Sequence, residues 1–215
     1  YFTAVNIDGE NLQKLTRSND KWYFDPRIPR EDQMGPPVYK HPDLDRGHLV
    51  RRIDPVWGDA AAQANDDTFH FTNCSPQHSK LNQRTWLGLE DYILSRARAQ
   101  QFRVTVFTGP VFRESDPPYL EVHRIPEEFW KVAVMVKDDG QLSATAYLQS
   151  QRDLISDLEV EAYGQYKTYQ VPIADIEGLT GLDFGALRQH DPLRPGELEA
   201  AAPIRLIGGV EDLVL

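Results

Sequence analysis

The chain of 215 residues has one cysteine, Cys74, and no long run of apolar residues. A single cysteine excludes an internal disulfide framework and a zinc site built from several cysteines. It fits a reducing compartment as well as an oxidising one, so it leaves the localisation open. No apolar stretch approaches the ~20 residues of a membrane-spanning helix, and the mean hydropathy is -0.51. We therefore expect a protein without membrane-spanning segments.

No signal-peptide pattern stands at the start of the sequence, which is Tyr1 rather than methionine. We expect a mature secreted or periplasmic form, or a domain of a longer bacterial protein. The sequence shows no internal repeat, no low-complexity tract and no clear domain boundary. A mass of 24.6 kDa with 40% hydrophobic residues is enough for one large core. We predict a single domain over 1–215, in which 190–215 is a less distinctive C-terminal extension.

Acidic residues outnumber basic ones by 33 to 23, which gives a formal net charge of -10. Such a charge repels nucleic acid, so any phosphate binding has to be local and sensitive to salt. Basic residues do gather in one part of the chain: Arg46, Arg51, Arg52, Lys80 and Arg84. This cluster is either a phosphate-binding patch or a solvated charged face.

Alternating and β-branched residues predict several strands and a central, mostly antiparallel sheet. The expected strands are 1–5, 22–24, 68–72, 102–112, 129–136 and 142–148, with a last strand within 204–215. Residues 44–53 are expected to be a strand or an extended segment that bends at Gly47. Apolar spacings of three and four predict a helix over 82–101. Its buried stripe is expected to be Trp86, Leu89, Ile93 and Ala97. We predict an α+β fold class in which helices flank the sheet.

Two blocks of polar residues carry the candidate chemistry. The first is Asp45-Arg46-Gly47-His48; the second runs from Thr72-Asn73 through a Ser75-Pro76 turn and Leu81-Asn82-Gln83 to Glu90. Hydrolysing a phosphodiester bond requires a base that activates water and a cation that stabilises negative charge. It also requires a group that holds the phosphate in line.

The residue types in these blocks match those needs. His48 titrates near neutral pH and suits the base. Asn82 offers a neutral amide oxygen to Mg²⁺, an ion that keeps most of its waters and takes one or two protein oxygens. Glu90 faces the same side of a continuous helix as Asn82 and is placed to orient a metal-bound water. The planar guanidinium of Arg46 suits a phosphate.

Each of these residues also has a purely structural interpretation. Asn82 can cap a helix, Glu90 can be a solvated helix charge, and Asn73 can satisfy a turn. Asp45 can simply pair with an arginine, and Gly47 can simply bend a strand. The other histidines are expected to be surface or hydrogen-bonded residues: His41, His70, His78, His123 and His190. The occurrence of the whole set in this order favours the chemical interpretation.

Together the blocks resemble the active site of the DNA/RNA non-specific endonucleases, the ββα-metal family that includes endonuclease G, in a bacterial-type form. The matching positions are Asp45 to His48, then Asn73, Pro76 and Gln77, then Leu81, Asn82, Gln83, Trp86, Leu89 and Glu90. Outside them, Thr108-Gly109-Pro110, Ile125-Pro126 and Phe129-Trp130-Lys131 resemble further family blocks. The likeness covers about residues 1–190.

The resemblance implies a ββα-metal nuclease core set in the α+β domain. It implies His48 as general base and Asn82 as the protein ligand of one Mg²⁺ or Mn²⁺ ion. It implies that Arg46, Asn73 and Glu90 support the phosphate, the base and the metal waters, with Asp45 in the same catalytic set. The implied reaction cuts DNA and RNA with little sequence preference, because binding is through the backbone, and leaves 5′ phosphates.

The sequence departs from the family at one position. Relatives often carry an arginine one helical turn after Glu90, where this chain has Leu94. Arg27 and Arg51 are the candidates for a second phosphate-binding arginine, although Arg27 is equally interpreted as a surface cation.

This departure and the acidic charge motivate an alternative: a catalytically inactive nucleic-acid-binding or interaction module of the same fold. A third interpretation is a nuclease domain regulated by flanking parts. A homodimer, a protein inhibitor and fused regulatory domains are open alternatives for its partners.

Overall fold

The computed structural model describes residues 2–16, 21–82, 87–120, 123–137, 139–152, 167–193 and 205–207. Its elements in chain order are β1 (Thr3–Asp8), η1 (Arg30–Asp32), η2 (Pro36–Lys40), β2 (Leu44–His48), α1 (Ala61–Asp67), η3 (Phe71–Asn73), β3 (Cys74–His78), α2 (Leu87–Gln100), β4 (Arg103–Val111), β5 (Pro118–Tyr119), β6 (His123–Arg124), β7 (Glu128–Val136), β8 (Leu142–Ser150), β9 (Lys167–Val171), α4 (Ile173–Thr180), η5 (Gly185–His190) and β10 (Arg205–Ile207).

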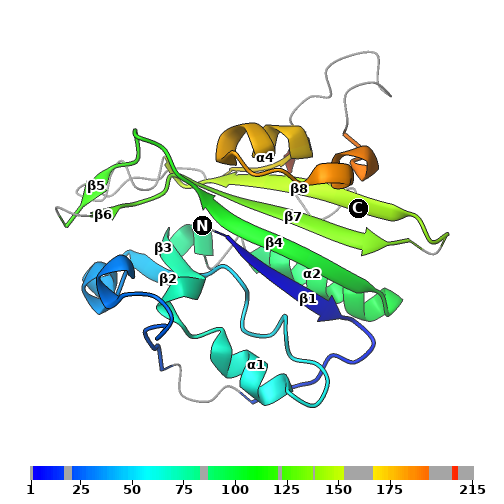
Figure 1. Cartoon of the computed structure of the whole chain (residues 1–215), viewed down its shortest axis with the longest axis horizontal. Helices are drawn as coiled ribbons and strands as arrows, with labels where there is room; N and C mark the ends of the chain where they lie inside the picture. Colours follow the sequence, from blue (N-terminus) through cyan, green and yellow to red (C-terminus); the bar gives the residue numbers. More distant parts are fainter. Residues whose placement is uncertain are drawn as a thin grey trace.

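A six-stranded sheet in the order β1-β4-β7-β8-β9-β10 dominates the fold. Every neighbouring pair in it is antiparallel. Helix α2 lies on one face of the sheet, whereas α4 and η5 lie on the other (Figure 1). The predicted α+β class, with a central antiparallel sheet flanked by helices, is confirmed. The expected last strand is also present, as the short β10 beside β9.

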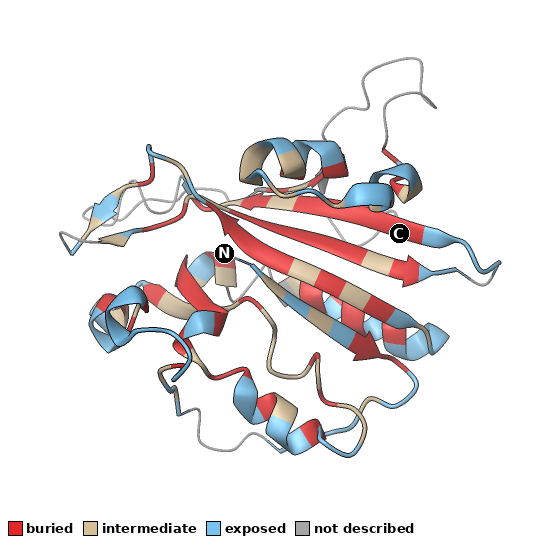
Figure 2. Ribbon diagram, viewed as in Figure 1, coloured by how far each residue is buried: buried red, intermediate tan, exposed pale blue. Residues whose placement is uncertain are grey.

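The alternation along β7 separates two cores rather than a core from solvent. Ala133 and Met135 pack in the cluster that contains Ile93 of α2. Trp130 and Val132 pack in the opposite cluster, with Ile173 and Ile176 of α4. Most of β4, β7 and β8 is accordingly buried (Figure 2). Each large apolar side chain enclosed in this way contributes roughly 1.5–3 kcal/mol to folding.

Helix α2 confirms the predicted apolar stripe where the chain is described. Leu89, Ile93 and Ala97 are buried against the sheet. Trp86 falls in 83–86, outside the described residues, so the continuity of one helix from Asn82 to Glu90 stays a prediction. Leu94, the departure from the family, is itself only 9% exposed and belongs to the same core.

The strand expected over 68–72 is wrong. The backbone N–H of Thr68 closes the end of α1 by donating to the Asn65 carbonyl, and Phe71 begins a 3-10 turn. The strand starts later, at Cys74, so the expected Ser75-Pro76 turn is also wrong: both residues lie inside β3. Local alternation missed this because the backbone N–H of Phe71 donates to a distant segment, the carbonyl of Tyr23.

Candidate active site

Strands β2 and β3 form an antiparallel ribbon that brings the two polar blocks together, with Gly47 opposite Ser75. A Cβ atom at Gly47 would lie 2.5 Å from Cγ of Gln77, and closer still to its Cδ and Oε1. Gln77 is fully buried and cannot swing into solvent. Gly47 therefore gives the Gln77 side chain room to cross the strand, and β2 continues through it rather than bending there.

The ring of His48 lies in an aromatic pocket. Its centroid is 4.6 Å from that of Trp22 and 5.1 Å from that of Phe69, whose ring is nearly perpendicular to it. Arg46, two residues earlier on the same face of β2, has its guanidinium carbon 5.3 Å from the ring centroid of Tyr39. The candidate base and the candidate phosphate-binding arginine therefore share one aromatic-lined face of the ribbon.

Cys74, opposite His48 on β3, is not a second nucleophile. Its Sγ lies 3.2 Å from the hydroxyl of Tyr39. Burial raises the pKa of the thiol to about 12, and a neutral thiol is a poor nucleophile. The side chain packs the ribbon and leaves the acid-base chemistry to the imidazole.

The Asn73 side chain contacts backbone. Its Nδ2 donates to the carbonyls of Val50 and Thr68, each at 2.9 Å, and its Oδ1 accepts from the N–H of Val50 at 2.9 Å. Its own carbonyl accepts from the N–H of Leu49 at 2.9 Å. These bonds secure the backbone that directly follows His48. Asn73 is therefore suited to orient His48 indirectly, by holding the backbone of the next two residues.

A direct hydrogen bond joins the two blocks: Nδ2 of Asn82 donates to Oδ2 of Asp45 at 2.9 Å. A carboxylate only accepts, so the amide nitrogen of Asn82 must face it and the amide oxygen must point elsewhere. Asp45 thereby determines which way the Asn82 amide is turned.

The donor set at this point suits a hydrated hard cation. In the described part of the chain, no group of three or more His, Cys, Asp or Glu side chains could hold a metal ion. A zinc-type or calcium-type cage is therefore absent from those residues. The oriented amide oxygen of Asn82 fits an ion that retains most of its waters, as Mg²⁺ does.

Glu90 lies in a buried cluster of charged side chains, together with Lys131 and Arg51. Its Oε1 is 3.2 Å from Nζ of Lys131, and its Oε2 is 3.9 Å from Nε of Arg51. Burial raises the pKa of Glu90, and the two cations act against that rise. Burial and the nearby charge of Glu90 also raise the pKa of Asp54, to about 7. Glu90 is therefore an enclosed carboxylate between two cations, and the solvated helix charge is excluded.

Both candidate arginines form ion pairs with carboxylates. Arg51 Nη1 lies 2.6 Å from Oδ1 of Asp91, and its side chain is largely enclosed. Arg27 is 83% exposed and pairs with Asp25 through both Nε, at 2.9 Å, and Nη2, at 2.7 Å. Arg51 is thus placed to hold α2, whereas Arg27 keeps an exposed guanidinium that Asp25 orients. Which of them meets phosphate stays a prediction.

The structure brings some of the predicted residues into contact. Asp45 contacts Asn82 directly, and His48 shares its strand with Arg46. Glu90 and Arg51 meet in the charged cluster. Arg27 belongs to a separate loop, connected to η3 through the bond from Thr72 Oγ1 to Oδ2 of Asp25 at 3.1 Å.

Sequence reasoning missed three residues of this region. Trp22, Asp54 and Lys131 were not among the candidate site residues. The Phe129-Trp130-Lys131 block was the available signal, because a lysine within an otherwise apolar strand is unusual.

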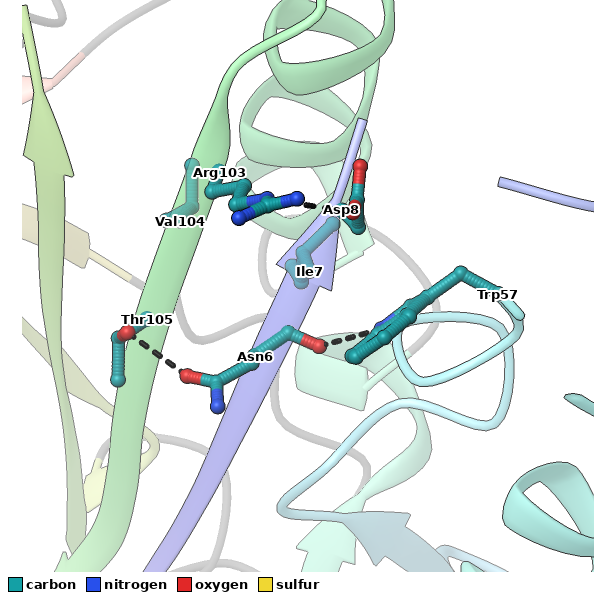
Figure 3. Close-up of a pocket in the computed structure, with 7 residues that line it drawn as sticks. All are labelled: Asn6, Ile7, Asp8, Trp57, Arg103, Val104 and Thr105. Atoms are coloured by element: carbon teal, nitrogen blue, oxygen red, sulfur yellow. Dashed lines mark hydrogen bonds and ion pairs between the residues drawn. The ribbon is translucent and has the colours of Figure 1, made fainter. Parts of the chain in front are cut away.

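A cavity of about 420 Å³ lies elsewhere, along the edge strand β1 (Figure 3). Its lining residues are Asn6, Ile7, Asp8, Trp57, Arg103, Val104 and Thr105. The indole of Trp57 donates to the Asn6 carbonyl at 2.7 Å, so the indole covers part of the strand edge. No predicted site residue lines this cavity.

Among the described residues, every helix is too short or too polar to cross a membrane.

Comparisons with known proteins identify the family of this chain. A sequence model of the DNA/RNA non-specific endonuclease family matches residues 1–190. Protein y4fB of Sinorhizobium fredii is 43% identical over 204 residues, which cover 86% of this chain and 30% of that protein. Nuclease C1 of Cunninghamella echinulata is 27% identical, over 85% of this chain and 74% of its own length. The nuclease of Serratia marcescens is 26% identical, over 75% of this chain and 59% of its own length.

Among solved structures, EndoG in the EndoG/EndoGI complex aligns with a TM-score of 0.65 at 20% identity, over 85% of this chain and 77% of that one. This match identifies the ββα-metal fold. The chain thus spans under a third of y4fB and somewhat over half of the Serratia nuclease. Use of a divalent metal ion is typical of the family. Since the family model covers all but the last part of the sequence, the chain belongs to the DNA/RNA non-specific endonuclease family.

Proposed function

We propose that this chain is a metal-dependent endonuclease that hydrolyses phosphodiester bonds of DNA and RNA and leaves 5′ phosphates. The observation that carries the proposal is the bond of 2.9 Å between Asp45 and Asn82. It joins Asp45, three residues before the candidate base on β2, to the candidate metal ligand, 37 positions away in the sequence.

In this proposal His48 is the general base. Its imidazole accepts a proton from a water molecule as the water oxygen attacks phosphorus. The bond from phosphorus to the 3′ oxygen breaks, so the phosphate stays on the 5′ end of the following nucleotide. The aromatic pocket of Trp22 and Phe69 holds the ring in one orientation, and the Asn73 bonds hold the backbone beside it.

The Asn82 amide oxygen would hold the cation, and the Glu90 carboxylate would orient its waters. A divalent ion bound there supplies positive charge that stabilises the phosphorane and the leaving 3′ oxygen. Arg46 clamps the phosphate by its planar fork. Contacts of this kind reach only the backbone of a nucleic acid, which accounts for cleavage with little base preference.

The test is a cleavage panel on supercoiled plasmid and single-stranded RNA with Mg²⁺, Mn²⁺ or chelator. Wild type should cut both substrates with either metal and neither substrate with chelator. The products should accept a 5′ label only after phosphatase treatment. His48→Ala should lose at least ~100-fold in rate with an unchanged melting temperature. His190→Ala, in η5 on the other side of the sheet, is the matched control and should keep full activity.

A His48→Ala protein that cuts at the wild-type rate would overturn the proposal. Retention of DNA by the wild type without any cutting would instead support the binding module that has lost catalysis.

A further inference from the structure

Lys131 is an unusual residue for the middle of a sheet. It lies on β7, between β4 and β8, and is only 1% exposed. Side chains two residues apart on a strand point to the same face, so Lys131 shares a face with Ala133 and Met135. That face is the one covered by α2. Burying an ammonium group is costly unless it is paired and hydrogen-bonded. Its partners should therefore explain why it is there.

The ammonium group reaches three other parts of the fold. Its Nζ lies 3.2 Å from Oε1 of Glu90 on α2 and 3.0 Å from Oγ1 of Thr108 on β4. It lies 3.4 Å from the carbonyl of Leu49, the residue that directly follows His48. The Thr108 hydroxyl and the Leu49 carbonyl accept hydrogen bonds from the ammonium group, and the Glu90 carboxylate is its ion-pair partner. Lys131 thus connects the centre of the sheet to the Glu90 carboxylate and to the backbone that directly follows His48.

Glu90 has little else to hold Oε1 in place among the described residues. Its Oε2 faces Arg51, at 3.9 Å, beyond hydrogen-bonding distance. Arg51 itself makes its short contact with Asp91. Burial raises the pKa of Glu90, and the charge of Lys131 is the largest influence that acts against it.

We propose that Lys131 is a positioning residue of the nuclease site, whose ammonium holds the Glu90 carboxylate in one orientation beside the backbone that carries His48. The inference rests on the proposed function, because it gives Glu90 the task of orienting metal waters. A carboxylate held from a central strand keeps its geometry better than one on a helix end alone. Partners that orient a metal shell are typically worth 10- to 100-fold in metal affinity.

The test compares Lys131→Met with wild type in two measurements. Mn²⁺ affinity, from the free-ion EPR signal, requires no catalysis; the metal dependence of plasmid cleavage gives the half-saturating concentration separately from kcat. Lys131→Met keeps the length of the side chain without its charge. It should weaken Mn²⁺ binding about tenfold or more and raise the half-saturating metal concentration to match. Gln149→Met, a fully buried position on the same sheet face, is the matched control and should change neither.

A double-mutant cycle with Glu90→Gln separates positioning from general damage. If Lys131 acts through Glu90, adding Lys131→Met to Glu90→Gln should change Mn²⁺ affinity and kcat by less than about twofold. A further tenfold loss in the double variant would overturn the inference. The double variant buries no unpaired charge, so this comparison still decides the question if Lys131→Met alone does not fold.

The two proposals fail differently. A wild-type chain that cuts no nucleic acid with Mg²⁺ or Mn²⁺ overturns the proposed function. A wild-type chain that cuts, with Lys131→Met within twofold of it in both measurements, overturns the role of Lys131 alone.

Discussion

Replacing Gly47 by alanine tests whether the Gln77 side chain of β3 packs directly on Gly47 of β2. The three atoms nearest to a Cβ at Gly47 all belong to the Gln77 side chain, and the farthest of them, Cγ, is at 2.5 Å. Gln77 is fully buried, so the overlap has to be relieved by moving the β2–β3 ribbon or its packing. Overpacking of this kind costs ~2 kcal/mol.

A second effect acts in the opposite direction. Alanine restricts the unfolded chain relative to glycine and stabilises the folded state by ~0.5 kcal/mol. The net loss expected for Gly47→Ala is therefore ~1.5 kcal/mol, which corresponds to a melting temperature lower by ~3–6 °C in a chain of this size. Because β2 also carries His48, a displacement of ~1 Å should lower kcat by up to ~100-fold.

The assay is urea denaturation of four proteins: wild type, Gly47→Ala, Gln77→Ala and the double variant. Gln77→Ala removes all three overlapping atoms, so in that background Gly47→Ala should cost nothing or stabilise slightly. The expected coupling energy is ~2 kcal/mol. Gly178→Ala, in α4, is the matched control and should not destabilise, because no atom lies within 4 Å of the place its Cβ would take. An equal cost of Gly47→Ala in both backgrounds would refute the reasoning.

Three further predictions concern the surroundings of the site. Asp45→Ala should raise the half-saturating Mg²⁺ concentration about tenfold in a cleavage assay, because the Asn82 amide loses the acceptor that orients it; an unchanged value would remove Asp45 from that role. Burial raises the pKa of Asp54 to about 7 in the folded chain, whereas the unfolded chain loses this proton near 3.8, so the contribution of Asp54 to stability falls as pH rises from about 4 to 7. Asp54→Asn should therefore melt higher than wild type at pH 8 and close to it at pH 4, in calorimetric scans; the same difference at both pH values would contradict this. Trp22→Ala should lower kcat/KM about tenfold by loosening the His48 ring, whereas Trp22→Phe should retain most of the rate.

Local patterns in the sequence predicted much of the fold. The strands within 102–112, 129–136 and 142–148 were visible because alternating side chains repeat every two residues. The buried stripe of α2 was visible because its spacing repeats every three to four. The two polar blocks were visible because chemically suited residue types follow one another in a specific order.

Patterns failed where a distant segment decided the local structure. Alternation predicted a strand over 68–72, but the bond between Phe71 and the Tyr23 carbonyl and the closure of α1 made it a turn. The sequence suggests a bend at Gly47 because nothing near that position shows that Gln77 crosses above it.

The sequence by itself determined the fold class, the identity of the candidate base and metal ligand, and the family. Only the tertiary structure decided that Asp45 orients Asn82, that Asn73 secures the backbone after His48, and that Lys131 supports Glu90 from the central sheet. The physical reason is that periodicity and residue type are local properties, whereas a hydrogen bond or a buried ion pair depends on which distant segments the fold brings within about 3 Å of each other.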